Sequence, residues 1–391
     1  MKTNALSLLA LTGALFLMAA CASEETNNKQ EQAQKPDTKG LTAFTVDGGA
    51  TRTTAEYDGS GLNFYWTAGD RLWVNNGTLI QDNSNNISAM LTPNPTTPTG
   101  VKRAATARFY FAGSYTAHSY PVRYTGKGST VGDKVTIKAQ QSQALPNDAA
   151  HISADGDCGT GTAINSGGGY NFTLDHKASY ITFMPYAGTG DSHDALAQCK
   201  LWKVRILSDQ AMGGVSFPVN DNGYNIVTWP TSGQKYIDLY CQEGNNAPTT
   251  SSTLNYTIAT SQGAAKSNGA IMVLAPGTYT NVKIEYYVYD KVVNNLHVFT
   301  KEIPTLTLNS GKNRPIYSEL KCKDYTSEYF TSYHMWGASA VYWNTGIGGP
   351  YHNWQPSGNN MDSGTPSYVI PQVGQQRYFS NVNGSVNADV D

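Results

Sequence analysis

Short segments in which apolar and polar residues alternate recur along most of the chain, and they constrain its fold more than any other feature. Clear examples are residues 107–111, 135–139, 202–206 and 282–289. Because neighbouring side chains of a β-strand point to opposite faces, each segment predicts a strand with one face on a core and the other in water. Helical periodicity is nearly absent after residue 20. We therefore expect an all-β protein built from antiparallel β-sandwiches.

The length of the chain and two changes in its composition predict how it divides. About 350 residues follow the first 40, which is room for two domains of ordinary size. A stretch rich in Gly and Asp ends near Lys177, and alternating segments become rare after Cys322. We expect an N-terminal sandwich, a C-terminal sandwich and an aromatic, Gly-rich extension at 41–177, 178–322 and 323–391. That extension is either a small irregular module or an incomplete one.

The first residues have the pattern of a lipoprotein signal peptide. Lys2 precedes an apolar run from Ala5 to Ala20, and this run is shorter than the roughly 20 residues that span a bilayer. Residues 17–21, LMAAC, look like a lipobox, in which the cysteine receives diacylglycerol before cleavage. We predict a signal peptide over residues 1–20 and a lipid anchor at Cys21 that holds the protein on a membrane. The alternative is an ordinary signal peptide followed by a chance cysteine.

A polar tether follows the anchor at residues 21–40. Its Asn, Gln, Lys, Glu and Pro residues cannot bury enough apolar surface to fold, so we expect disorder there. Glu24 and Glu25 resemble the export signal that sends lipoproteins to the outer face of the outer membrane in fimbriated anaerobes. The alternative is a merely solvated tether. The predicted location is the cell surface, on the outer membrane.

Charge and cysteine content exclude some classes of partner. The net charge is −2 and charged residues make up 14% of the chain, without a basic stripe, which argues against nucleic acid. Four cysteines remain after Cys21. They form either two disulfides, whose pairing the sequence does not specify, or buried thiols. They are Cys158, Cys199, Cys241 and Cys322.

Motifs for catalysis are scarce. The seven histidines include no pair at the spacing of helical metal ligands, and no Gly-flanked serine elbow is present. Residues 155–161, DGDCGTG, superficially match a calcium loop but lack its closing acidic residue, so we interpret them as a polar surface loop. We predict no metal site, no cofactor and no enzymatic activity. A glycosidase whose two carboxylates meet only in the fold is a third alternative.

Three tryptophans stand out in the C-terminal extension: Trp336, Trp343 and Trp354. Exposed indole rings offer flat apolar faces on which sugar rings stack, and the neighbouring Asn and Gln side chains can bind hydroxyl groups. These tryptophans are therefore candidate glycan contacts. The alternative is that they form the small core of the extension itself.

The order of several segments resembles the fimbrillin family, the pilin and pilus-tip lipoproteins of type V pili. The resemblance covers about residues 41–320. The segments are Phe44–Val46 with residues 50–53 (ATRT), Trp66 with residues 69–74 (GDRLWV), residues 172–183 with Leu174, His176 and Ala178, residues 272–279 (MVLAPGTY), and residues 306–308 (LTL) with Gly311 and Lys312.

The resemblance implies two transthyretin-like antiparallel β-sandwich domains and a specific maturation. In the family a trypsin-like protease cuts after Arg or Lys, the first strand is lost, and a strand of a neighbouring subunit fills the groove. Arg52 best matches the cut site and Lys39 is a second candidate. Phe44 and Val46 would lie on the displaced strand. The alternative for Arg52 is an ordinary loop arginine.

The extension after Cys322 is more like an added tip or accessory module than the end of a stalk subunit. The sequence thus predicts an accessory or tip pilus subunit with a role in adhesion. Its partners would be other pilus subunits, the membrane through the lipid, and a host or bacterial glycan or protein receptor. The alternative is a glycan-binding surface lipoprotein that does not polymerise.

Overall fold

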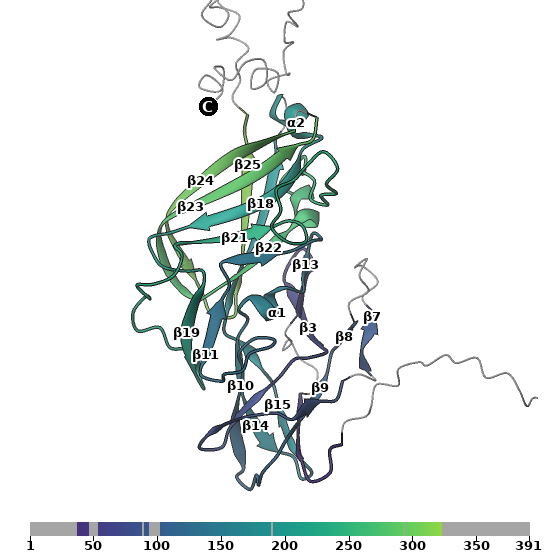
Figure 1. Cartoon of the computed structure of the whole chain (residues 1–391), viewed down its shortest axis with the longest axis vertical. Helices are drawn as coiled ribbons and strands as arrows, with labels where there is room; N and C mark the ends of the chain where they lie inside the picture. Colours follow the sequence, from purple (N-terminus) through teal and green to yellow (C-terminus); the bar gives the residue numbers. More distant parts are fainter. Residues whose placement is uncertain are drawn as a thin grey trace, which may run out of the picture. The chain divides into compact units, whose positions relative to one another are not determined.

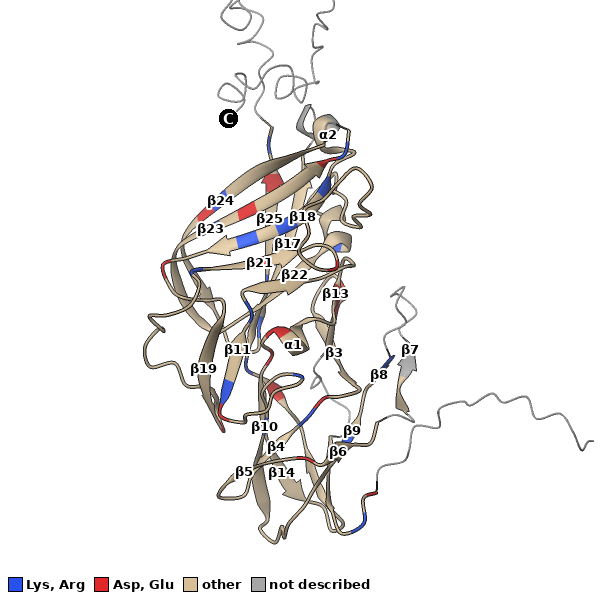
Figure 2. Cartoon of the chain, in the orientation of Figure 1, with Lys and Arg blue, Asp and Glu red and all other residues tan. Residues whose placement is uncertain are grey.

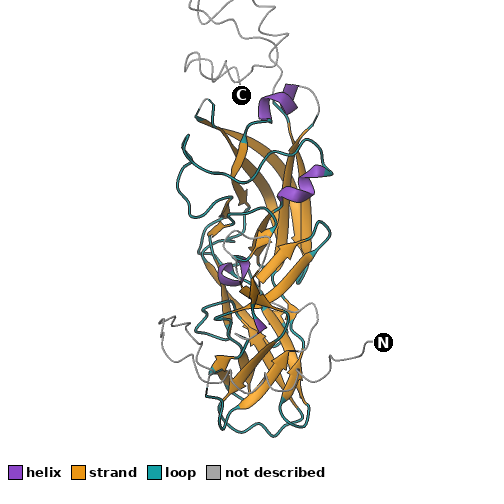
Figure 3. Cartoon of the chain, turned by 90° about the vertical axis from the view of Figure 1, so that its right-hand side faces the viewer, coloured by secondary structure: helices purple, strands orange, loops and turns teal. Residues whose placement is uncertain are grey.

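The structure is a computed structural model and describes residues 37–46, 54–87, 90–93, 102–188, 191–292 and 294–322 (Figure 1). All of these belong to one compact unit that begins at Asp37. Strands dominate, and the helices α1 (Ile152–Asp155), α2 (Asp191–Leu196) and η2 (Ala264–Asn268) are short (Figure 3). The predicted all-β fold is confirmed. No helix among these residues is long and apolar enough to cross a membrane.

The first large sheet contains the strand nearest the N-terminus in an interior position. Its order is β5 (Leu79–Gln81), β4 (Trp73–Asn75), β10 (Ser119–Tyr124), β14 (Gly159–Asn165), β15 (Tyr170–Phe172), β1 (Thr42–Val46), β9 (Ala107–Phe111) and β6 (Ser84–Asn85), and β16 (Asp175–His176) also pairs with β14. The strand β1 is parallel to β15 and antiparallel to β9. It thus has a hydrogen-bonded neighbour on both sides.

A second sheet packs against the first across a shared core. Its order is β13 (Asp148–Ala149), β2 (Thr54–Tyr57), β3 (Leu62–Thr67), β8 (Lys102–Ala104) and β7 (Thr92–Pro93). Buried residues of both sheets form one apolar cluster, including Phe44 of β1, Trp66 of β3 and Phe109 of β9. Two sheets enclosing an apolar layer are the arrangement of a β-sandwich.

The later strands build three further sheets around a second core. A five-stranded sheet has the order β12 (Gln140–Ser142), β21 (Tyr236–Tyr240), β18 (Lys200–Leu207), β23 (Gly277–Asp290) and β24 (Asn295–Leu308). Two three-stranded sheets have the orders β22 (Ala270–Leu274), β17 (Ser179–Ala187), β25 (Asn313–Leu320) and β11 (Lys134–Ile137), β19 (Val215–Asn220), β20 (Gly223–Tyr224). Their inward residues share one apolar cluster.

Two strand pairings join residues on either side of Lys177. The strands β11 and β12 precede Lys177, yet β11 pairs with β19 and β12 pairs with β21. Sequence alternation identifies a strand but does not identify its partner. The expected division of the chain near Lys177 stays a prediction.

Three pairs of strands are parallel rather than antiparallel: β1 with β15, β12 with β21, and β17 with β25. The other strand pairs of the described sheets are antiparallel, as expected. A parallel pair needs a long connection between its strands, and all three join segments far apart in the sequence.

The strand β18 departs from the alternation expected for residues 202–206. A β-bulge between Leu201 and Lys203 shifts the register against β23. The expectation that Trp202 shares a face with Val204 and Ile206 was wrong, because an extra residue at a bulge re-aims the side chains next to it. Trp202 packs with Tyr240 and Tyr289 in a separate cluster, whereas Val204 lies in the main core.

Candidate functional site

The position of β1 in the first sheet is the feature of this fold with the clearest functional potential. Phe44 lies opposite Tyr170 of β15 on one side and Phe109 of β9 on the other. Within β1, Phe44 and Val46 are buried while Thr45 is half-buried. We call the place between β15 and β9 that β1 occupies the strand slot.

The strand slot contains an aromatic pocket that encloses the side chain of Phe44. The ring of Tyr170 is stacked on the Phe44 ring, with centroids 4.7 Å apart. Phe111 and Tyr115 approach it edge-on at 4.9 Å and 5.2 Å, and Tyr120 is tilted at 6.5 Å. Edge-to-face and stacked pairs each add about 0.5–1.5 kcal/mol beyond the burial of apolar area. These ring contacts therefore stabilise β1 in the slot, in addition to its pairing with β9 and β15.

The hydroxyl groups of the pocket are hydrogen-bonded to the backbone of residues 112–117. Tyr170 donates a hydrogen bond to the carbonyl of Ala117 at 2.8 Å, and Tyr115 donates to the carbonyl of Ala112 at 3.1 Å. The hydroxyl of Tyr120 accepts hydrogen bonds from the backbone N–H groups of residues 116 and 117. These bonds hold the rings in place and leave apolar surface toward the occupant.

Gly169, directly before β15, lets the backbone of the strand in the slot approach β15 closely. A Cβ added to Gly169 would lie 2.6 Å from the carbonyl oxygen of Ala43, which is closer than non-bonded atoms can approach. The neighbouring Gly168 has open space around it instead. Gly169 therefore has a local role in seating β1, which its neighbour does not share.

The segments before and after β1 carry the predicted cleavage sites. Lys39 is exposed in a turn ahead of β1, where the N–H of Leu41 donates to the carbonyl of Thr38. Arg52 lies between the end of β1 and the start of β2 in the sequence, outside the described residues. The predicted lipid site at Cys21 and the glycan candidates Trp336, Trp343 and Trp354 also fall outside the described residues. Each of these assignments stays a prediction.

The outer edge of β22 is covered by two buried glutamine side chains. Gln141 donates to the carbonyl of Val273 at 2.8 Å and accepts from the N–H of the same residue at 3.0 Å. Gln143 accepts from the N–H of Ile271 at 2.6 Å and donates to the carbonyl of Gly269 at 3.0 Å. The two side-chain amides thus replace a neighbouring strand, which satisfies an edge that would otherwise accept one.

The long edge strand β24 has two features that oppose strand addition. Pro304 lacks a backbone N–H, so it cannot donate to a ladder. Lys301 is on the same strand, and its ammonium donates to the carbonyl of Tyr317 on β25 at 2.7 Å. A proline and a tethered lysine are common protections of exposed edges. Sequence analysis identified neither this protection nor the two glutamines, although Gln141 and Gln143 stand at the two-residue spacing of one strand face.

The motif of Gly69 and Asp70 has a structural role beside the first core. The carboxylate of Asp70 is buried and accepts from the N–H of Thr67 at 2.7 Å and from the hydroxyl of Tyr124 at 3.1 Å. Gly69 has a φ of +85°, a left-handed conformation that favours glycine. The residues matched to the fimbrillin pattern here close a turn at the end of β3.

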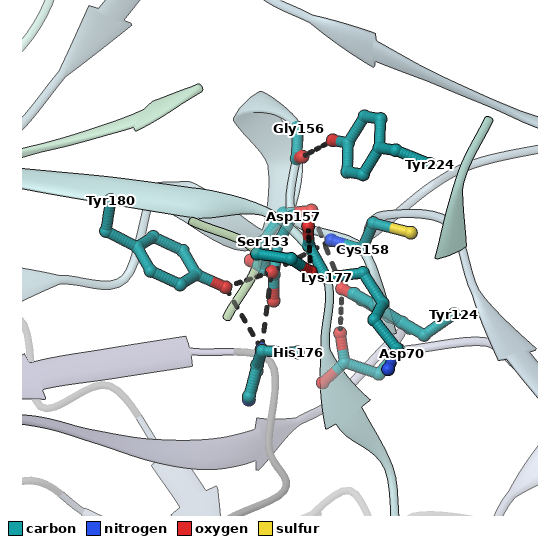
Figure 4. A network of polar contacts seen from close by, with 11 residues as sticks. Asp70, Tyr124, Ser153, Gly156, Asp157, Cys158, His176, Lys177, Tyr180 and Tyr224 are labelled. Atoms are coloured by element: carbon teal, nitrogen blue, oxygen red, sulfur yellow. Dashed lines mark hydrogen bonds and ion pairs between the residues drawn. The ribbon is translucent and has the colours of Figure 1, made fainter. Parts of the chain in front are cut away.

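The expectation of a polar surface loop at residues 155–161 was wrong, because both of its carboxylates are buried. Figure 4 shows the contacts of Asp157 with Tyr180 and His176. Asp157 accepts from the hydroxyl of Tyr180 at 2.5 Å, and its Oδ1 lies 3.4 Å from Nδ1 of His176. Burial, followed by the nearby charge of Asp157, raises the pKa of Tyr180 well above its usual value. Gly156 has a φ of +137°, and a Cβ there would contact Ile137 at 2.5 Å. The turn carries a polar network into the interior.

Two of the cysteines are poorly suited to thiol chemistry. Cys158 and Cys241 are buried and do not form disulfides, and burial raises the pKa of both thiols. A thiol held in its protonated form is a poor nucleophile and a poor metal ligand. The described residues also contain no group of three or more His, Cys, Asp or Glu side chains that could hold a metal ion.

The outer face of the five-stranded sheet carries a buried ammonium group, which the alternation had placed in water. The Nζ atom of Lys203 lies 4.1 Å from the ring centroid of Tyr287 and 3.5 Å from a carboxylate oxygen of Asp238. Burial lowers the pKa of Lys203. Arg205 binds the same carboxylate with two hydrogen bonds, at 2.7 Å and 2.8 Å. Figure 2 shows residues of both charge signs on neighbouring strands of this sheet.

Comparison with known proteins gave matches only among solved structures. No protein-family model matches the chain, and no curated protein matches it. A "putative cell adhesion protein" from Bacteroides ovatus is similar over 71% of this chain and 91% of its own, at 14% identity and a TM-score of 0.40. A second such protein, from Bacteroides uniformis, is similar over 73% and 94%, at 14% identity and a TM-score of 0.37. A fimbrial assembly protein from Parabacteroides distasonis is similar over 71% and 90%, at 9% identity and a TM-score of 0.30.

Proposed function

We propose that this protein is a cell-surface accessory or tip subunit of a pilus, joined to its neighbour by strand exchange at the strand slot. The observation that carries the proposal is the position of β1, which is near the N-terminus and yet lies inside a sheet, with Phe44 in the aromatic pocket. Removing such a strand would leave one edge of β9 and one edge of β15 unpaired and expose an apolar groove. An extended segment of another subunit can fill that groove through main-chain hydrogen bonds.

Cleavage at Arg52 and at Lys39 would have different consequences. A cut after Arg52 separates β1 from β2, so β1 is then held only by non-covalent contacts. A cut after Lys39 leaves β1 joined to the rest of the chain, because β1 begins at Thr42. Strand exchange therefore requires the cut after Arg52, and Lys39 serves at most to trim the tether.

The protection of two other edge strands favours the strand slot over those two edges as the site of exchange. Gln141 and Gln143 cover β22, and Pro304 and Lys301 oppose addition to β24. An incoming strand would bind where pairing groups and apolar pockets are both open. The strand slot without β1 meets both conditions, whereas these two edges do not.

Limited trypsin digestion of the mature chain tests the proposal. We expect an early cut after Arg52, followed by assembly or by capture of an added peptide that copies residues 39–47. Arg52→Gln should prevent both events, whereas Lys39→Gln should leave them intact. N-terminal sequencing locates the cut, and light scattering measures assembly. A chain that loses β1 but stays monomeric and captures no peptide contradicts the proposal.

Surface attachment through Cys21 is a second part of the proposal, supported by the lipobox pattern. The Cys21→Ala variant should lose the lipid and leave the outer-membrane fraction. Fractionation and mass spectrometry of the N-terminal peptide measure this outcome. An unchanged distribution of the variant would contradict the lipid anchor without affecting the strand slot.

A further inference from the structure

We propose that the strand slot selects its partner by side-chain pattern: phenylalanine, then any residue, then a β-branched aliphatic residue. The partner is an extended segment of another subunit, and it runs parallel to β15 and antiparallel to β9. This inference rests on the proposed function, because it names the kind of strand that the slot would accept. The intrachain occupant, from Ala43 to Val46, provides the geometry.

The phenylalanine position is the most selective one. Rings at 4.7 Å to 6.5 Å surround Phe44 with both stacked and edge-on contacts. A leucine would fill less of this pocket and lose the ring contacts. A tyrosine would bring a hydroxyl next to rings whose own hydroxyls already bond to the loop of residues 112–117. An unpaired hydroxyl in an apolar site is costly, so the pocket favours phenylalanine over tyrosine.

The backbone of the residue before the phenylalanine passes close to Gly169. The carbonyl oxygen of Ala43 lies 2.6 Å from the position that a Cβ of residue 169 would take, and the Cβ of Ala43 lies 3.5 Å from that position. Because this close contact is made by the backbone oxygen, it requires glycine at position 169 and does not limit the side chain at position 43. The phenylalanine must still enter its pocket. The requirement also fixes the register, because a shift by one residue would move the phenylalanine out of its pocket.

The two following positions differ in their selectivity. Val46 is buried opposite Phe172 and Ala107, so a β-branched aliphatic residue fits between a large and a small neighbour. The hydroxyl of Thr45 accepts from Nε of Arg108 at 3.2 Å, in an exposed contact. Exposed polar contacts contribute little to affinity, so the middle position is tolerant. Selectivity thus falls on alternate residues, as in other cases of strand addition.

The test uses the mature chain with a site-specific protease sequence placed between Val46 and Thr54, so that the cut does not depend on Arg52. After cleavage, exchange of β1 for labelled peptides is followed by fluorescence anisotropy. The reference peptide copies residues 39–47. Replacing its phenylalanine by alanine should weaken binding about 100-fold or more, and replacing it by tyrosine about 10-fold. Replacing the threonine by alanine should change binding less than about threefold.

The outcomes separate this inference from the proposed function. If the reference peptide binds and the alanine peptide binds equally well, the pattern is overturned while strand exchange stands. If the reference peptide does not exchange at all, the proposed function fails. A peptide with the reversed sequence should not bind, and its binding at the reference affinity would overturn the inferred direction. Gly169→Ala in the cut chain should weaken the reference peptide, whereas Gly168→Ala should not.

Discussion

The ring of Phe44 is stacked on the ring of Tyr170, with centroids 4.7 Å apart and planes 12° apart. The two residues are on the parallel strands β1 and β15, which are more than a hundred positions apart in the sequence. This contact connects the segment before the predicted cleavage site to the core of the first sandwich. The stability of the intact chain and the behaviour of the cut chain therefore depend on the same side chain.

Phe44→Ala should lower the free energy of unfolding by about 3–5 kcal/mol, because a buried aromatic side chain is lost and a cavity remains. Thr45→Ala, on the opposite face of the same strand, is the matched control and should cost less than about 1 kcal/mol. Urea denaturation followed by tyrosine and tryptophan fluorescence measures both. Equal effects of the two substitutions would show that the pocket does not hold β1.

Gly169→Ala should destabilise the intact chain by about 1–3 kcal/mol, since the new methyl group would overlap the carbonyl of Ala43. The adjacent Gly168→Ala has space for its methyl group and should be close to neutral. Thermal unfolding of both variants checks the difference. A neutral Gly169→Ala would mean that β1 shifts away from β15 at little cost.

Gln141→Leu should destabilise the chain by about 1–3 kcal/mol, because the N–H and the carbonyl of Val273 would lose their buried partner. It should also open the edge of β22 and increase concentration-dependent association. The exposed Gln140 on the same strand provides the control Gln140→Leu. Analytical ultracentrifugation over a range of concentrations measures association. A monomeric Gln141→Leu variant would contradict the protective role.

The stability of the chain should fall as pH drops below about 6.5, in part because of His151. Both ring nitrogens of His151 are buried, and burial lowers its pKa from 6.5. The folded state then binds fewer protons than the unfolded state between the two pKa values, so stability rises with pH through that window. His151→Phe should reduce the increase of stability with pH in this window.

His297 also has a pKa lowered by burial, so some of the slope should remain in the His151→Phe variant. Denaturation curves at several pH values from 5 to 8 provide the comparison. A slope in His151→Phe equal to that of the unsubstituted chain would contradict the role of His151.

The sequence predicted the class of fold because side-chain alternation is a local property. Strands were correctly predicted at residues 107–111 and 282–289, and their burial follows the alternation except at Tyr110 and Tyr289, which are buried on the opposite face. The strands β4 and β5 form a hairpin whose turn contains Asn76 and Gly77, residue types that are common in such turns. Short-range geometry of this kind depends on neighbouring residues only.

The tertiary structure decided which strands meet, because pairing depends on contacts between distant segments. Alternation does not reveal that β1 lies between β15 and β9, or that β11 pairs with β19. The bulge that moves Trp202 and the buried Asp157 also result from packing against distant strands.

Some features of the strand slot follow from the sequence, and others are visible only in the structure. The sequence by itself determined that Phe44 and Val46 belong to one face of an early strand and that Arg52 follows it. The structure decided that this strand lies inside a sheet, that four aromatic rings enclose Phe44 and that Gly169 admits the chain beside it. The physical reason is that a pocket is made by side chains brought together from separate strands. No local pattern in the sequence shows which side chains come together to form the pocket.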